Sequence, residues 1–324
     1  MVSLRKLPVF RLPEDVLREI ARNMNYLQLV ALSLLSKKCK TLVKSLHLSC
    51  YSFQLLTDTF TINLVPTRGD RRIEFRLELV GGDYKDLSET PREVRVVRGR
   101  KEGFRWVNQG GLNLLQLITH LQYIFAHANR TEAIFSGNGV FDLESFRACR
   151  LNLTHLVIEN VYTDEDTMRA QQILKIFGSK AKNLTLHDCD PIRAPYTVQH
   201  LGIQNFNKLT CLKLHSVTLD DLLVFNARHV RLGKPAKMRA SHLNRFFNCC
   251  IRGVNPRLTY LTFPRPDDSY TVHRLLKGIP YQVFRGRRLH EAGTVVGGVD
   301  FRSEKGKLAT LLLVDTFLLF YVWH

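Results

Sequence analysis

The sequence predicts a chain of mixed class, with α+β and α/β regions in succession, and three observations support this. Apolar residues follow a helical period near the N-terminus, alternate with polar residues in the middle, and recur further on as short strand-like pairs separated by helical stretches. Of the 324 residues, 45% are hydrophobic and 23% charged, which is the balance of a globular protein. The length allows one large domain or several smaller ones, at about 100 to 200 residues each.

Residues 1–49 are predicted to contain three short helices. Residues 14–24 place apolar side chains on one helical face, and a break follows at residues 23–25. Asn25 can cap a second helix with Gln28 as its capping-box partner, and Ser36 can cap a third. So small a unit buries little surface alone, so we expect the rest of the chain or a partner to complete it. The apolar faces comprise Val16, Leu17, Ile20, Ala21 and Met24; Leu27, Val30, Ala31, Leu34 and Leu35; and Cys39, Leu42, Val43 and Leu46.

Residues 50–149 are predicted to be rich in β-strand, with one helix. Apolar and polar residues alternate there as they do in half-buried strands. Gly81-Gly82-Asp83 indicates a turn between two of the strands. The strands are expected at residues 57–65, 71–80, 93–99 and 131–135, and the helix at residues 112–128.

A weaker pattern repeats through residues 150–290. Pairs of apolar residues recur at steps of 28, 28, 18 and 31 residues, and residues 165–177 and 241–251 have helical spacing. Leucine-rich repeats have a period of about 20 to 29 residues, so we predict an irregular leucine-rich-repeat-like region whose strand face could bind proteins. The alternative is an unrelated α/β domain in which strands and helices alternate. The aligned pairs are Leu156/Ile158, Leu184/Leu186, Leu212/Leu214, Val230/Leu232 and Leu261/Phe263.

Residues 291–324 are predicted to form C-terminal strands. The apolar run LATLLLVDTFLLFYVW contains Asp315 and is shorter than the roughly 20 residues of a membrane-spanning helix, so we interpret it as buried strand. The N-terminus has no apolar run of signal-peptide length, which predicts a cytoplasmic or nuclear chain. In that setting the cysteines should be reduced and mostly buried. They are Cys39, Cys50, Cys149, Cys189, Cys211, Cys249 and Cys250.

The net charge of +18 favours acidic partners, whether acidic protein surfaces or nucleic acid. The basic residues are dispersed and form no nucleic-acid-binding motif, so solvated surface charge is the simpler interpretation. A basic interaction protein that binds nucleic acid or an acidic scaffold is therefore the alternative function that composition leaves open.

The sequence predicts no active site, cofactor or metal site. No phosphate-binding loop, nucleophile elbow or zinc-binding helix motif occurs. His120 and His127 are expected on one helix, as structural residues rather than as a catalytic pair. The acidic clusters at residues 163–167 and 219–221 stand where helices should begin, so capping explains them.

The stretch from Leu12 to Leu42 resembles an F-box. The family pattern begins with Leu-Pro and runs through an amphipathic helix, a break, a leucine-rich helix, and then serine and basic residues. Residues 219–263 resemble the type 2 F-box-associated domain, most distinctively at the Asn255-Pro256-Arg257-Leu258 turn, and the C-terminal tail is similar to the last strands of the same proteins. The F-box pattern is carried by Leu12 and Pro13; Val16, Leu17 and Ile20; Leu27, Leu29, Leu32 and Ser33; and Ser36, Lys37, Lys38 and Lys40.

This resemblance implies a non-catalytic substrate receptor of an SCF-type ubiquitin ligase. The F-box would bind the Skp-type adaptor, which connects to a cullin and a RING protein, and the rest of the chain would hold a protein substrate. Catalysis would reside in the partners, with this chain contributing proximity. The charge favours an acidic substrate, and neither a membrane nor a nucleic acid is expected as partner. Adaptor contact is expected from Leu12, Pro13, Val16, Leu17, Ile20, Leu29, Leu32 and Ser33, although each could instead pack the unit onto the rest of the chain.

Overall fold

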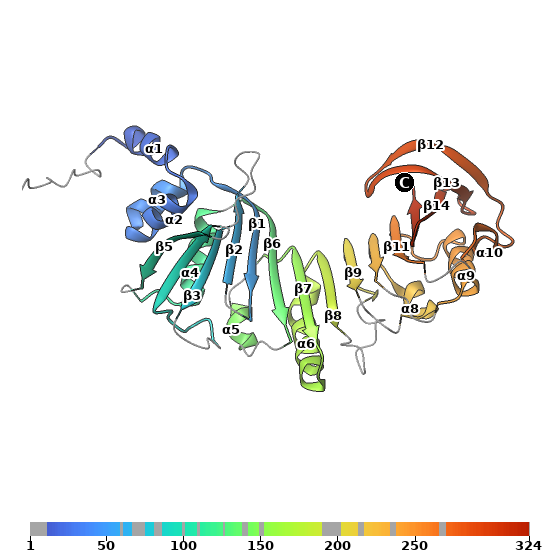
Figure 1. The fold of residues 1–324 in the computed structure, drawn as a ribbon, viewed down its shortest axis with the longest axis horizontal. Coiled ribbons are helices and arrows are strands. Elements are labelled where there is room, and N and C mark those ends of the chain that lie inside the picture. The colour runs from blue at the N-terminus through green and yellow to red at the C-terminus, as the bar shows by residue number, and fades with distance from the viewer. Residues whose placement is uncertain are drawn as a thin grey trace, which may run out of the picture. The chain divides into compact units, whose positions relative to one another are not determined.

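The computed structural model describes two compact units (Figure 1). The first unit comprises residues 1–133 and 139–152, and the second comprises residues 134–138 and 153–324. The described residues are 12–58, 61–66, 75–80, 86–98, 101–108, 111–125, 127–137, 142–148, 152–189, 202–212, 217–233, 238–265 and 270–323. The Gly81–Asp83 turn, Leu214 and Cys149, which the sequence singled out, lie outside them.

The first unit begins with the three predicted helices, α1 (Glu14–Arg22), α2 (Tyr26–Leu35) and α3 (Lys37–Lys44). The Asn25 side chain accepts from the backbone N–H of Gln28 at 3.0 Å, and the Gln28 side chain accepts from the Asn25 N–H at 2.9 Å. The Ser36 hydroxyl accepts from the Cys39 N–H at 3.2 Å. The predicted caps are thus confirmed, and they begin α2 and α3 at the two predicted positions.

An antiparallel sheet forms most of the rest of the first unit. The antiparallel strands β1 (Ser49–Leu56), β2 (Thr61–Pro66), β3 (Phe75–Val80), β4 (Glu93–Arg98) and β5 (Lys101–Val107) follow in chain order. Strand β6 (His127–Ser136) lies beside β1, and its residues 134–136 belong to the second unit. Four of these match predicted strands, whereas β1 and β5 were not predicted. Helices α4 (Leu114–Ile124) and α5 (Leu143–Ala148) also belong here, so the expectation of one helix was wrong.

The predicted helix at residues 112–128 is shorter than expected. It ends at Ile124, and His127 begins β6, so His120 and His127 do not share a helix. The apolar spacing ran past the helix end because Phe125, which caps it, is itself buried.

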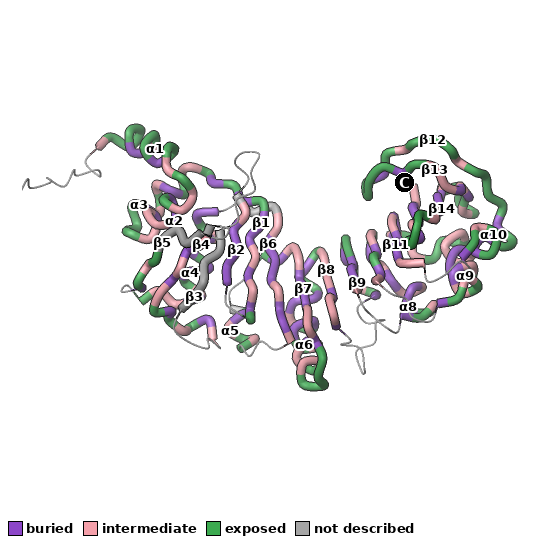
Figure 2. The backbone as a smooth tube through the Cα atoms, viewed as in Figure 1, coloured by how far each residue is buried: buried purple, intermediate pink, exposed green. Residues whose placement is uncertain are grey.

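The second unit has parallel strands followed by an antiparallel end. Strands β7 (His155–Val161), β8 (Asn183–Cys189), β9 (Lys208–Leu212), β10 (His229–Leu232) and β11 (Tyr260–Pro264) pair in parallel, each with the next. From β11 the order continues through β15 (Phe317–Val322), β14 (Leu308–Val314), β13 (Gly293–Arg302) and β12 (Gln282–His290), all antiparallel. The edge strand β12 is largely exposed (Figure 2).

Helices cover one face of this sheet. They are α6 (Asp164–Phe177) with the short η2 (Gly178–Lys180), α8 (Leu219–Val224), α9 (Ala240–Ile251) and α10 (Val272–Leu275). The Phe247 ring of α9 lies 5.1 Å from the Phe320 ring of β15. Residues paired across strands share a face, so the row in register with Phe320 is the helix-covered core. That row is Leu156, Leu184, Leu209, Val230, Leu261, Phe320, Leu311 and Val299, all buried.

The predicted strand alignment is correct except at β9. Leu156 pairs with Leu184, and Val230 pairs with Leu261, as expected. In β9, however, Leu209 and Cys211 are in register with Leu184 and Leu186 of β8, whereas Leu212 pairs with His187. The segment KLTCLKL has apolar residues at both spacings, so the sequence alone does not decide the register. The predicted register was wrong by three residues and put Leu212 on the helix-covered face, whereas in the structure Leu212 lies on the opposite face.

The C-terminal apolar run forms two strands rather than one. Val314 of β14 pairs with Phe317 of β15, so Asp315 and Thr316 form a two-residue turn. Asp315 has φ of 45°, a left-handed conformation that aspartate tolerates better than bulky residues. No helix in the described ranges has the length and apolarity needed to cross a bilayer.

The predicted helix starts and cysteine states are confirmed where the structure describes them. Thr163 and Asp166 form a capping box on α6, and Thr218 and Asp221 form one on α8. Six of the seven cysteines lie among the described residues and all six are free thiols, four of them buried.

Candidate functional site

The helices α1 and α2 place the predicted adaptor-contact residues in three environments. Val16 and Ile20, one helical turn apart on α1, are 43% and 38% exposed. Pro13 is also exposed, while Leu12 and Leu32 are partly buried. The remaining three side chains are buried inside the first unit: Leu17, Leu29 and Ser33. The exposed pair Val16 and Ile20 marks a surface that could bind a partner, because valine and isoleucine side chains are usually buried in a core.

Helix α4 anchors α2 and α3 through three contacts. Ser33 lies 2.8 Å from Nε2 of His120, and its hydroxyl donates to the Val30 carbonyl at 2.7 Å. The Tyr26 ring stacks on Phe125 with centroids 6.1 Å apart. The ammonium groups of Lys44 and Lys40 lie 3.9 and 4.8 Å from the centre of the Tyr123 ring. The helical unit is therefore completed by its own chain on this side, which we call the α4 anchor.

His120 is held neutral by its surroundings. Burial, and secondarily the charge of Lys40, lowers the pKa of His120 to about 4. The hydroxyl of Ser33 has a single proton, which it gives to Val30, so the imidazole donates through Nε2. Ser33 thus joins α2 to α4 in the interior of the unit.

The face of the second sheet opposite the helices carries polar, aromatic and basic side chains. Asn183 contacts His155 at 3.0 Å, and the Tyr260 and Tyr321 rings lie 5.1 Å apart. These residues belong to one row of strand partners, which alternates with the buried row. The row consists of His155, Asn183, Lys208, His229, Tyr260, Tyr321, Thr310 and Asp300.

A trough of about 510 Å³ lies on this helix-free face. Its size is within the usual range of ligand pockets. Lys208 and Arg231 are exposed along it, and Phe317 is 42% exposed. The trough is lined by Lys208, His229, Val230, Arg231, Tyr260, Thr262, Glu291, Ala292, Phe317 and Leu319.

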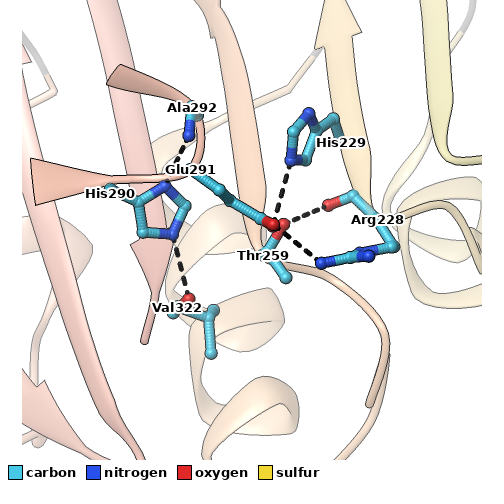
Figure 3. A network of polar contacts seen from close by, with 7 residues as sticks. All are labelled: Arg228, His229, Thr259, His290, Glu291, Ala292 and Val322. Carbon is cyan, nitrogen blue, oxygen red and sulfur yellow. Dashed lines mark hydrogen bonds and ion pairs between the residues drawn. The ribbon is translucent and has the colours of Figure 1, made fainter. Parts of the chain in front are cut away.

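Glu291, in the turn between β12 and β13, reaches the start of β10 (Figure 3). One carboxylate oxygen lies 2.7 Å from Nη2 of Arg228, and the other lies 3.1 Å from Nε2 of His229. Hydrogen bonding by Thr259, followed by His229 and the charge of Arg228, lowers the pKa of Glu291 to about 2. The single Thr259 proton serves either this carboxylate or the Arg228 carbonyl, 3.1 Å away. The network ties the hairpin turn to the parallel strands.

An aromatic wall continues from this network to the C-terminal end of the chain. His290 lies 5.2 Å from the Tyr321 ring and 5.0 Å from the Trp323 ring. His290 accepts from the Ala292 N–H through Nδ1 at 3.0 Å, which leaves Nε2 to donate to the Val322 carbonyl at 3.2 Å (Figure 3). These directional contacts give the wall a fixed shape.

The buried thiols are poor candidates for nucleophiles. Burial raises the pKa of Cys50 to about 11 and those of Cys189 and Cys211 to about 12. Each therefore stays protonated near neutral pH, and the thiol is much less reactive than the thiolate. No cluster of three or more histidine, cysteine, aspartate or glutamate side chains suited to a metal ion occurs in the part of the chain that the structure describes.

Sequence reasoning left the trough unidentified. The basic residues, Lys208 and Arg231 among them, were interpreted there only as dispersed surface charge. The alternation of apolar and polar residues along β10 indicates that His229 and Arg231 share a face, but Glu291 arrives from a hairpin more than 60 residues later.

Comparison with known proteins gives matches in two parts of the chain, one in each unit. A family model described as F-box domain matches residues 9–51, which include α1, α2 and α3. A model described as F-box associated matches residues 197–263, which include β9, α8, β10 and α9. The F-box associated domain-containing protein sdz-33 of Caenorhabditis elegans is 24% identical over 285 residues, covering 85% of each chain. No solved structure gave a significant match.

Proposed function

We propose that this chain, which matches the F-box and F-box-associated families, is a substrate receptor of an SCF-type cullin–RING ubiquitin ligase. The observation that carries the proposal is the combination of the two matches with two separate binding surfaces. The F-box match covers the exposed apolar face of α1, and the F-box-associated match includes the trough-lining residues of three strands, β9, β10 and β11. The first surface would bind the Skp-type adaptor and the second a protein substrate.

In this proposal the eight predicted contact residues divide between contact and support. Pro13, Val16 and Ile20 enter a groove of the adaptor, in the manner of an amphipathic helix, with Leu12 and Leu32 at the margin. Leu17, Leu29 and Ser33 are buried in this chain and hold the helices in position. The α4 anchor keeps that surface fixed relative to the rest of its unit.

The second unit supports an irregular leucine-rich-repeat-like receptor surface. Parallel strands in chain order, with helices on one face, leave the other strand face open for a protein partner. With the observed register of β9, equivalent core residues recur at steps of 28, 25, 21 and 31 residues. Three of these steps fall within the leucine-rich-repeat period of about 20 to 29 residues. Ubiquitin transfer itself would be carried out by the cullin-bound RING protein and the conjugating enzyme, in the cytoplasm or nucleus.

Adaptor capture by the purified full-length chain tests this function. The double variant Val16→Asp/Ile20→Asp should reduce affinity for a recombinant Skp-type adaptor by about 100-fold or more, because two apolar side chains no longer enter its groove. The matched control is Met168→Asp/Ile203→Asp, whose positions are 60% and 57% exposed in the second unit. The control should bind like the wild type. Normal capture by a folded Val16→Asp/Ile20→Asp chain would contradict the proposal.

A further inference from the structure

We propose that the trough binds an acidic segment of a protein partner, and that Glu291 occupies part of the site in place of a partner carboxylate. The partner's status as a ligase substrate rests on the proposed function, but the binding chemistry does not. The site combines cations, an exposed aromatic ring and an internal carboxylate on one sheet face.

The charges of the trough fit carboxylates. Lys208 and Arg231 project from the neighbouring strands β9 and β10, and neither forms an ion pair within the described ranges. Beside them, Arg228 and His229 already hold the carboxylate of Glu291 at 2.7 and 3.1 Å. A site that already binds the Glu291 carboxylate therefore lies beside two cations, Lys208 and Arg231, that have no carboxylate partner in the described ranges. The planar guanidinium of an arginine is well suited to binding a carboxylate.

The other lining residues favour a peptide over a nucleic acid. Phe317 and Leu319 of β15, with Tyr260 of β11, provide an apolar side on which an aliphatic side chain can lie. Nucleic-acid binding gains its strength from many phosphate contacts, whereas this trough offers two unpaired cations and already contains an acidic group. A segment in which glutamates or aspartates flank an apolar residue matches both sides.

Glu291 gives the site an internal competitor. It lies on the turn between β12 and β13, and its side chain is 39% exposed at the end of the trough. A partner carboxylate that approaches Arg228 and His229 must displace it or lie beside a like charge. Removing the charge of Glu291 while keeping its shape should therefore strengthen the binding of an acidic segment. If Glu291 only stabilised the fold, the same change would not strengthen binding.

The test measures fluorescence anisotropy of a labelled peptide, Gly-Glu-Glu-Leu-Glu-Glu-Gly, on the full-length chain. Lys208→Glu/Arg231→Glu should weaken binding by at least about tenfold, because two attractive contacts become repulsive. Glu291→Gln should tighten it by roughly threefold. The matched control Arg252→Glu/Lys277→Glu changes two exposed charges of the same unit outside the trough lining and should bind like the wild type.

Three outcomes would overturn the proposal. They are equal binding of a peptide with lysine in place of glutamate, insensitivity to Lys208→Glu/Arg231→Glu, and tighter binding of a thymidine oligonucleotide at the same site, which would assign the trough to nucleic acid. Adaptor capture is measured on every variant in parallel. Peptide binding without adaptor capture would refute the ligase role and leave the trough assignment standing, whereas adaptor capture without peptide binding would do the reverse.

Discussion

At the scale of single residues, a buried neutral histidine makes the first unit sensitive to acid. His120 binds no proton in the folded state until the pH approaches about 4, whereas an unfolded histidine is protonated below about 6.5. Between these values the unfolded chain binds one more proton than the folded chain. The free energy of unfolding therefore falls as the pH falls through this window.

We predict that His120→Asn removes this pH dependence. In the wild type, the free energy of unfolding should fall by up to about 1.4 kcal/mol for each pH unit between about 6.5 and 4. Urea unfolding followed by Trp106 fluorescence, in a Trp323→Phe background, reports the first unit. The difference in unfolding free energy between wild type and His120→Asn should narrow on acidification, and a constant difference would contradict the assignment.

Glu291 responds in the same pH direction as His120 but over a lower range. Its folded-state pKa of about 2 lies below the ordinary value of 4.5, so its stabilising contribution is full above 4.5 and is lost only as the pH falls towards 2. The network in Figure 3 thus persists through the window in which His120 weakens the first unit. Mild acid should loosen the helices at the N-terminus before it loosens the hairpin over the trough.

At the scale of elements, the sequence was most informative where a local signal fixes an end. Asn25 and Ser36 cap helices as predicted, and the acidic clusters at residues 163–167 and 219–221 stand at the starts of α6 and α8, because capping depends on residues only three positions apart. It was least informative where the choice depends on a distant partner. The register of β9 is set by β8 and β10, and the chain reversal at Asp315 divides a run that is otherwise mostly apolar.

The attachment of α2 to α4 is an element-scale feature that can be tested separately. We predict that Tyr26→Ala lowers the free energy that holds α2 against α4 by about 1 kcal/mol, because the stack on Phe125 is lost. Hydrogen exchange of the α2 and α3 amides should accelerate, while exchange in the second unit should stay unchanged. Tyr162→Ala, at a site 70% exposed in the second unit, is the matched control and should leave α2 protected. Unchanged exchange in Tyr26→Ala would mean that the other anchor contacts suffice.

At the scale of the whole molecule, the exposed face of α1 and the trough differ in how well they could be predicted from the sequence. The exposed apolar face of α1 lies within one short stretch, where helical periodicity and the resemblance to the F-box pattern coincide. The trough draws on four strands and a hairpin turn between Lys208 and Leu319, and its members become neighbours only through the order of the sheet. Charge alone indicated an acidic partner without indicating where it would bind.

A receptor requires both surfaces on the same chain, and this requirement gives the last prediction. We expect the wild type, together with the adaptor, cullin, RING protein and conjugating enzyme, to support ubiquitin transfer to a reporter that carries the acidic test peptide. Val16→Asp/Ile20→Asp and Lys208→Glu/Arg231→Glu should each slow transfer by at least about tenfold, since either change abolishes the high effective concentration of reporter at the ligase. Mixing the two variants should not restore transfer, because one copy holds the reporter and the other holds the ligase. A mixture that recovers the wild-type rate would show that the surfaces act on separate copies, and the chain would then work as an assembly rather than as a single receptor.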